Sequence, residues 1–222
     1  MEKVKLTTSD GLFIDANYFK VEQPAGWIIL SHMMPATKES WDDLAKTFQD
    51  LKYECLAIDL RGHGESTGGP DGFKNFSDED HQKTILDLEV AVKFLKEKGA
   101  IPEKTIFIGA SIGANLSLEY ISEYPEFKKA VLLSPGIDYK GIKTIPLIEK
   151  LKADQAVFFI GACDDERNLG NMANQIIEIT KSVPLGVRKE IKIFDNGGHG
   201  TDILLNQPEL KNLIIQFIQS ND

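Results

Sequence analysis

Short, continuous apolar runs recur along the chain and are separated by segments with a helical period. Such runs are typical of strands that are buried on both faces of a sheet. Six segments show this pattern, beginning at residues 27, 53, 105, 129, 155 and 189 and reading WIILSH, YECLAIDL, TIFIGA, KAVLLSP, QAVFFIGA and KEIKIFD. They predict a sheet of mostly parallel, buried strands.

The first twenty residues follow a different pattern, with apolar and polar positions in alternation. The stretches VKLTT and LFIDANYFK, at residues 4–8 and 12–20, flank the turn residues Ser9, Asp10 and Gly11. Alternation on both sides of such a turn predicts a hairpin of two antiparallel strands.

Two segments carry apolar residues at helical spacing. These residues are Ile85, Leu88, Val92 and Leu95 in one segment, and Leu210, Leu213 and Phe217 in the other. Each set forms a stripe on one face of a helix, and Gly99 is suited to end the first helix. Strands that alternate with helices imply right-handed crossovers and helices on both faces of the sheet. Because no proline- or glycine-rich linker divides the chain, we expect residues 1–222 to form a single domain.

Composition excludes several classes of function. The 222 residues include 25 basic and 34 acidic side chains, a formal charge of −9, so a general affinity for nucleic acid or an anionic membrane has no electrostatic support. The N-terminal segment lacks the apolar run of a secretory signal, and no stretch approaches the length of a membrane-spanning helix. We therefore expect a cytoplasmic protein. The absence of CxxC and HxxxH pairs argues against a zinc site, and we expect no metal or cofactor.

Candidate catalytic groups follow three of the predicted strands. Functional groups of an open parallel sheet gather outside the carboxyl ends of its strands. Ser111 follows TIFIGA, Asp164 and Asp165 follow the strand at 155, and His199 follows the last strand. A serine, an acid and a histidine therefore occur in this order at three strand ends.

The serine lies in GASIG, residues 109–113, which fits the pattern G-x-S-x-G. A tight turn between a strand and a helix could also use these residues without any catalytic role. The predicted strand before the motif and the helical pattern ANLSLEYISEY after it are the context that the motif requires. We expect no room for a side chain at Gly109 or Gly113, since a Cβ there would collide with a neighbouring strand or helix.

A serine hydroxyl needs a base, and the base needs an orienting acid. Among the four histidines, we interpret His199 as the base because Gly197, Gly198 and Gly200 surround it. His32 and His63 lie on other strand-end loops, where packing is the expected role, and His81 is expected at a solvated helix start. The residues themselves leave Asp164 and Asp165 open as alternatives for the acid.

Taken together, GASIG, Gly161-Ala162-Cys163-Asp164, the GGHG at 197–200 and AIDLRGHGES resemble the serine α/β-hydrolases over nearly the whole chain. The resemblance implies an α/β-hydrolase fold with a mostly parallel sheet of about eight strands. It also implies that Asp164, rather than Asp165, is the acid, and that the RGHGES loop is architectural.

The oxyanion hole departs from the family pattern. Members often carry His-Gly after the third strand, whereas this chain has His32-Met33-Met34. Backbone N–H groups do not depend on the side chain, so we expect Ile112 to supply one donor and Met34, or alternatively Met33, the second. The two thioethers could instead line the acyl pocket.

Many α/β-hydrolases carry a helical lid after the sixth strand, but here residues 136–154 leave room only for a loop and a short helix, TIPLIEKLK. We expect a short cap-like segment and an open site. The resulting hypothesis is a serine carboxylesterase for small to medium acyl esters. A thioesterase, a peptidase, a dienelactone-type hydrolase and a non-catalytic scaffold remain alternatives, and oligomeric state is left open.

Overall fold

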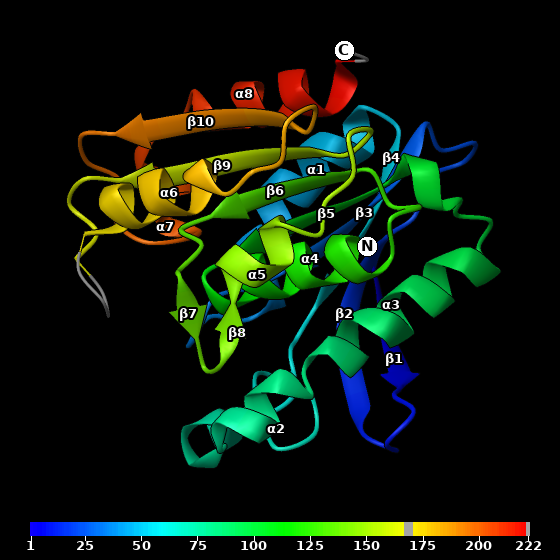
Figure 1. The fold of residues 1–222 in the computed structure, drawn as a ribbon. Helices are drawn as coiled ribbons and strands as arrows, with labels where there is room; N and C mark the ends of the chain where they lie inside the picture. Colours follow the sequence, from blue (N-terminus) through cyan, green and yellow to red (C-terminus); the bar gives the residue numbers. More distant parts are fainter. Residues whose placement is uncertain (167–170, 221–222) are drawn as a thin grey trace.

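The predicted sheet is confirmed by the computed structural model, which describes residues 1–166 and 171–220. Eight strands form it in the order β1-β2-β4-β3-β5-β6-β9-β10 (Figure 1). Their bounds are β1 Glu2–Thr7, β2 Phe13–Phe19, β3 Gly26–Ser31, β4 Tyr53–Ile58, β5 Thr105–Ala110, β6 Lys129–Leu133, β9 Ala156–Ala162 and β10 Arg188–Phe194. β2 is antiparallel to β1 and β4, and all other neighbours are parallel.

Helices cover both faces of the sheet (Figure 1). The helices are α1 Asp42–Asp50, α2 Asp78–Gln82, α3 Ile85–Glu97, α4 Ile112–Glu123, α5 Thr144–Ile148, α6 Met172–Lys181, α7 Asp202–Asn206 and α8 Leu210–Gln219, with short 3₁₀ turns at Lys38–Trp41, Gly72–Asn75 and Pro102–Lys104. Buried residues of α3, α4, α5 and α6 belong to one apolar cluster, and those of α1, α7 and α8 to a second. The two clusters are the two halves of the core, one on each face of the sheet.

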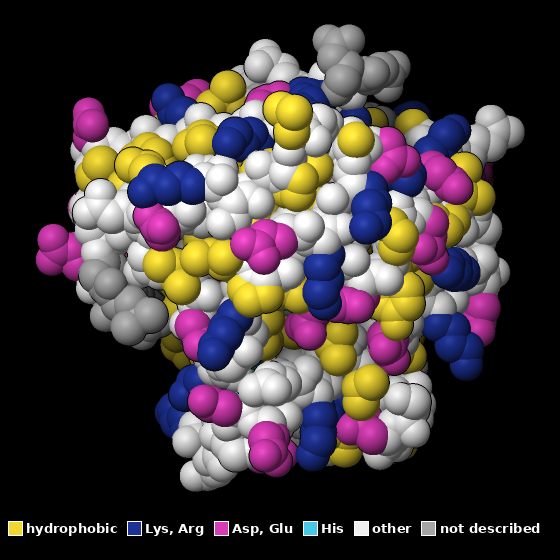
Figure 2. All heavy atoms as spheres, in the orientation of Figure 1, with side chains coloured by type: hydrophobic (Ala, Val, Ile, Leu, Met, Phe, Trp, Pro, Cys, Tyr) yellow, Lys and Arg dark blue, Asp and Glu magenta, His cyan; other side chains and the backbone are white. Residues whose placement is uncertain are grey.

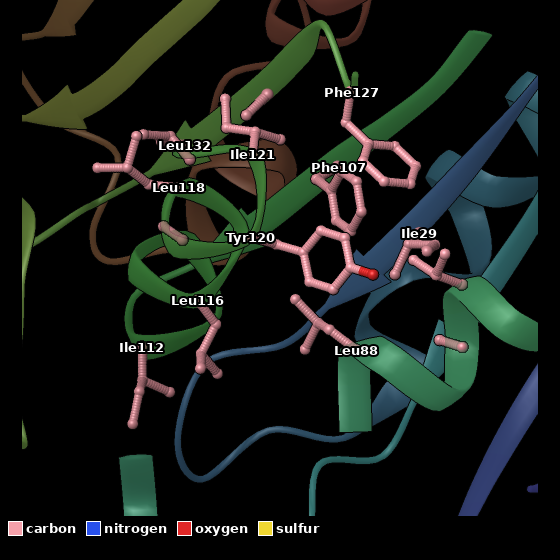
Figure 3. Packing of buried hydrophobic residues seen from close by; sticks show 14 of the residues in the cluster. Ile29, Leu88, Phe107, Ile112, Leu116, Leu118, Tyr120, Ile121, Phe127 and Leu132 are labelled. Carbon is pink, nitrogen blue, oxygen red and sulfur yellow. The ribbon is translucent and has the colours of Figure 1, made fainter. Parts of the chain in front are cut away.

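The first cluster is dense around α4 (Figure 3). Phe107 of β5 stacks on Tyr120 of α4 with ring centroids 4.8 Å apart, and Phe127 packs edge-on against both rings. Burial of large aromatic side chains stabilises a core through the apolar area removed from water and through ring geometry. This packing fixes the helix that begins directly after Ser111.

Gly99 ends α3 as predicted. Its φ of +98° is in the left-handed region, where glycine carries no Cβ penalty. The Gly99 N–H donates to the Lys96 carbonyl at 3.0 Å, and the Ala100 N–H donates to the Leu95 carbonyl at 2.9 Å. These two bonds form a Schellman motif, which satisfies carbonyls that would otherwise be unpaired at the helix end.

The segment between β6 and β9 contains small elements only. Besides α5 it has a hairpin of two short strands, β7 (Asp138–Tyr139) and β8 (Ile142–Lys143). Asn115 of α4 fixes the base of this hairpin, because its amide donates to the carbonyls of Gly136 and Ile142 at 3.0 and 2.8 Å and accepts from the Gly136 N–H at 3.1 Å. One buried amide thus joins the cap segment to the helix that follows the serine.

Charged side chains of both signs are interspersed on the face of the molecule seen in Figure 2, with no basic stripe on that face. Within the described ranges, none of the helices combines the length and the apolar character needed to cross a membrane.

Candidate active site

Ser111 occupies a strained turn between β5 and α4. Its φ and ψ are +55° and −120°, a combination that residues with a side chain rarely adopt. The Ser111 N–H donates to the Leu133 carbonyl of β6 at 2.8 Å, which holds the turn to the sheet. Backbone strain that the surroundings enforce is typical of functional sites, and here it positions the hydroxyl at the N-terminus of a buried helix.

The two glycines of GASIG are required by close packing, as predicted. A Cβ on Gly109 would overlap the Gly113 carbonyl and lie 2.6 Å from the Ala114 nitrogen. A Cβ on Gly113 would overlap the Ser31 carbonyl oxygen of β3 and lie 2.7 Å from the His32 carbonyl oxygen. The first turn of α4 therefore lies directly against the carboxyl ends of β5 and β3.

His199 forms a buried pair with Asp165. The Nδ1 atom of His199 lies 2.6 Å from Oδ2 of Asp165, and both residues are 3% exposed. An ionised carboxylate can only accept, so Nδ1 of the ring carries a proton, and in the neutral form of the ring Nε2 is the nitrogen without one. This tautomer is the one that a general base in acyl transfer requires.

The prediction that Asp164 orients His199 is wrong for this structure. The carboxylate of Asp164 instead accepts the N–H groups of Gly197 and Gly198, at 3.1 and 3.0 Å. These two hydrogen bonds lower the pKa of the exposed Asp164. The two aspartates lie at a turn directly after β9, where the Asp165 N–H donates to the Ala162 carbonyl at 3.4 Å, and only the Asp165 carboxylate is hydrogen bonded to the ring.

The loop after β10 brings His199 to the same sheet edge as Ser111. The Gly200 N–H donates to the Ser134 hydroxyl at 2.9 Å, and a Cβ on Gly200 would lie 3.3 Å from the Ala110 Cβ and 2.6 Å from the Met33 sulfur. The residue after the histidine therefore contacts both the residue before the serine and the loop after β3. Ser111, His199 and Met33 follow β5, β10 and β3, and Gly200 lies where the three loops approach one another.

The Ile112 N–H lies at the start of α4, directly after Ser111. The first intrahelical bonds of α4 run from the N–H groups of Ala114 and Asn115 to the Ser111 carbonyl, at 2.9 and 3.2 Å, so the Ile112 N–H precedes the hydrogen-bond ladder. Met34 is partly buried and packs against the core cluster that contains Ile112. An N–H at the start of a helix is well suited to receive negative charge.

The other three histidines are buried away from solvent. His63 stacks on Phe73 with ring centroids 4.1 Å apart, and burial lowers its pKa. His81 is 3% exposed and packs edge-on against Phe76, so the expectation of a solvated position is wrong. His32 is fully buried and hydrogen bonds to backbone on both sides of its ring.

The short cap nevertheless reaches the site, and Ser111 and His199 are both buried. Ser111 is only 6% exposed, and the ring of Tyr139 in the cap hairpin packs edge-on to His199 with centroids 6.5 Å apart. The expectation of an open site is therefore wrong for these two side chains. The sequence analysis did not identify Tyr139, Asn115 or Ser134 as residues near the site. Asn115 could have been noticed as an asparagine inside an apolar helix, and Ser134 as a serine at the end of a strand.

A buried lysine fixes the segment that follows Met34. Lys38 is 1% exposed, and its ammonium lies 2.7 Å from Asp59, 3.0 Å from Glu65 and 3.2 Å from Asp15. The Lys38 N–H also donates to Asp59 at 2.8 Å. A buried cation persists when carboxylates surround it. The cluster thus ties the loop after β3 to the carboxyl end of β4.

Comparison with known proteins agrees with this architecture. The polyketide transferase grgF of a Penicillium species is 31% identical over 157 residues, which are 69% of this chain and 52% of that protein. The bifunctional esterase/perhydrolase DCH of Acinetobacter calcoaceticus is 32% identical over 133 residues, 58% of this chain and 43% of that protein. The chain thus spans about half the length of these curated relatives.

The fold is shared with solved structures as well. An esterase from Pyrococcus furiosus superimposes with a TM-score of 0.77 at 22% identity, over 98% of this chain and 89% of that one. A family model described as serine aminopeptidase, S33, matches residues 22–161, more than half of the chain, and includes Ser111. The chain therefore belongs to this serine aminopeptidase (S33) family of α/β-hydrolases.

Proposed function

We propose that the protein is a serine carboxylesterase with Ser111 as nucleophile, His199 as general base and Asp165 as the orienting acid. The observation that carries the proposal is the 2.6 Å contact between His199 Nδ1 and Asp165 Oδ2, in a loop whose Gly200 approaches the residue before a serine in a strained turn. A serine hydroxyl becomes a useful nucleophile only when a base with a fixed tautomer removes its proton.

In the proposed reaction, the Ser111 oxygen attacks the ester carbonyl carbon while Nε2 of His199 takes the hydroxyl proton. The tetrahedral intermediate collapses as the imidazolium returns this proton to the leaving alkoxide, which departs as the alcohol. Water then attacks the acyl-serine, with its proton passing to Nε2, and the acid is released with the serine restored. Asp165 stabilises the imidazolium in both halves of the reaction.

The negative oxygen of the intermediate would receive hydrogen bonds from the N–H groups of Ile112 and Met34. Met34 is favoured over Met33 by the direction of the preceding peptide. The His32 carbonyl faces Gly113, so the Met33 N–H of the same planar peptide points away from the first turn of α4. The next peptide can direct the Met34 N–H toward the serine.

A small to medium acyl ester is the proposed substrate. The side chains of Ile112 and Met34 are apolar and the cap segment is short, which suits a modest acyl chain. One similar protein is named an esterase/perhydrolase, which supports ester cleavage. The matching family model is described as an aminopeptidase, so amide cleavage is the second candidate.

A labelling experiment tests the proposal. The wild-type protein should react with a fluorophosphonate probe at Ser111 and hydrolyse p-nitrophenyl acetate and butyrate, whereas Ser111→Ala should do neither. A panel of p-nitrophenyl esters, acyl thioesters and aminoacyl-p-nitroanilides then separates esterase from thioesterase and peptidase. An unlabelled wild type, or retention of most activity in Ser111→Ala, would contradict the proposal and favour a non-catalytic scaffold.

A further inference from the structure

His32 holds two backbone groups at once. Its ring is fully buried at the end of β3; the Leu60 N–H donates to Nε2 at 3.0 Å, and Nδ1 lies 2.9 Å from the Met33 carbonyl oxygen. Because a backbone N–H can only donate, Nε2 has to accept. The ring is therefore neutral with its proton on Nδ1, and this N–H donates to the Met33 carbonyl. Burial lowers the pKa of His32 to about 3, in agreement with a ring that stays neutral.

The Met33 carbonyl and the Met34 N–H belong to one peptide unit. A trans peptide is planar, so its C=O and N–H point in opposite directions. A ring that holds the Met33 carbonyl therefore also fixes the direction of the Met34 N–H.

The other side of the ring is attached to a rigid part of the fold. Leu60 is 1% exposed and follows β4, and its carbonyl accepts the His63 N–H at 3.0 Å. The ring of His63 packs edge-on against that of His32 with centroids 4.9 Å apart. The His32 ring is thus held by the end of β4 and by a neighbouring ring, and it transmits this fixed position to the Met33 peptide.

We propose that His32 is a positioning residue for the oxyanion hole: its Nδ1–H holds the Met33 carbonyl so that the Met34 N–H is aimed at the developing oxyanion. The inference rests on the proposed function of Ser111 and adds a residue that does not touch the substrate. Its effect belongs to the transition states, because the oxyanion develops there and in the tetrahedral intermediate but is absent from the bound substrate. Loss of the restraint should therefore lower kcat and leave KM nearly unchanged.

Two substitutions separate the two hydrogen bonds of the ring. In His32→Asn the amide nitrogen can occupy the place of Nδ1 and still donate to the Met33 carbonyl. In His32→Gln the amide oxygen can occupy the place of Nε2 and accept from Leu60, but no donor is left near Met33. Each variant keeps one bond, so similar thermal stability is expected for both, and thermal melts serve as the matched control.

The expected result is a difference in catalysis. His32→Asn should keep kcat within about threefold of the wild type, whereas His32→Gln should lose about tenfold or more, a part of the 100- to 1000-fold effect of removing an oxyanion donor. The affinity for a trifluoromethyl ketone, whose hemiketal places an anion in the hole, should fall by the same factor. Equal kcat in the two variants, or a greater loss in His32→Asn, would overturn the inference.

A measurement on the unaltered protein tests the same point independently of folding. The ¹⁵N resonances of His32 should show a neutral ring protonated at Nδ1, and a ring protonated at Nε2 would overturn the inference. Failure of the proposed function has a different signature, since the wild type itself would then remain unlabelled by fluorophosphonate and inactive on esters.

Discussion

Asp164 and Asp165 are adjacent in the chain, yet their carboxylates hold two different parts of one loop. Asp165 accepts from the ring of His199, and Asp164 accepts from the backbone of Gly197 and Gly198. One aspartate thus fixes the tautomer of the histidine, and the other fixes the path of the chain that carries it.

This division predicts unequal effects of two isosteric substitutions. Asp165→Asn should lower kcat by about 10⁴-fold, because the amide no longer enforces the Nδ1–H tautomer. Asp164→Asn retains one acceptor oxygen for the glycine N–H groups and should lower kcat less than about tenfold. The measurement is kcat on p-nitrophenyl butyrate, with far-ultraviolet circular dichroism as the control for folding. A greater loss in Asp164→Asn would show that Asp164 is the functional acid.

Gly113 should tolerate no side chain. In Gly113→Ala the new methyl group would overlap the Ser31 carbonyl, where both backbone segments are buried, and we expect a loss of about 3 kcal/mol or more in the free energy of unfolding. Gly99→Ala is the matched control. Gly99 has a φ of +98° and nothing within 4 Å of a Cβ, so only backbone strain of about 1–2 kcal/mol is expected. Urea unfolding compares the two, and equal losses would rule out the steric explanation.

Lys38 should be essential for stability. Lys38→Met keeps the aliphatic stem but leaves the Asp59 and Asp15 carboxylates without their cation, and breaking a buried ion pair from one side costs about 3–5 kcal/mol. Lys3→Met, which removes an exposed partner of Glu65, should have little effect. Urea midpoints at pH 7 provide the measurement. A stable Lys38→Met variant would mean that the carboxylates are readily hydrated or protonated.

Glu119 should make stability depend on pH. Burial raises the pKa of Glu119 from 4.5 to about 7, and the negative charge of Glu123 adds to this rise. The folded state then binds the Glu119 proton more tightly than the unfolded state. The contribution of this protonation to stability is therefore fully present below pH 4.5 and is lost as the pH rises through 7. Glu119→Gln should therefore match the wild type at low pH and exceed its stability at pH 8.

The variant Glu123→Gln provides the control for this prediction. Removing the neighbouring charge lowers the pKa of Glu119 and should reduce the pH dependence without abolishing it. Urea unfolding at pH 5, 6, 7 and 8 records both effects. Parallel curves for the wild type and Glu119→Gln would contradict the assignment.

The sheet and the position of the serine were predictable because each depends on a local pattern. Strands buried on both faces are continuous apolar runs, and the strained turn at Ser111 requires small residues at fixed places. The glycines at 109 and 113 could be interpreted from the same motif, because a Cβ at Gly109 meets the turn itself and a Cβ at Gly113 meets the neighbouring strand β3.

The choice between Asp164 and Asp165 could not be made from spacing. A shift of one residue changes the separation from His199 by almost nothing, but it decides whether the carboxylate binds the ring of His199 or the backbone of Gly197 and Gly198. The coverage of the site was also hidden, because it depends on Tyr139 reaching His199 from a separate segment. Contacts between distant segments carry no periodic signal in the chain.

The tip of the cap hairpin has a further consequence for the design of this enzyme class. Lys140 and Gly141 form an exposed two-residue turn with φ values of +58° and +83°, while the base of the same hairpin is attached to α4 by Asn115. A longer segment spliced between these two residues would enlarge the cap, while the turn at Ser111 keeps its place. The tip of the cap and the turn at Ser111 are thus separable parts of the structure, and the Asn115 amide is one of the contacts that hold the base of the cap in place.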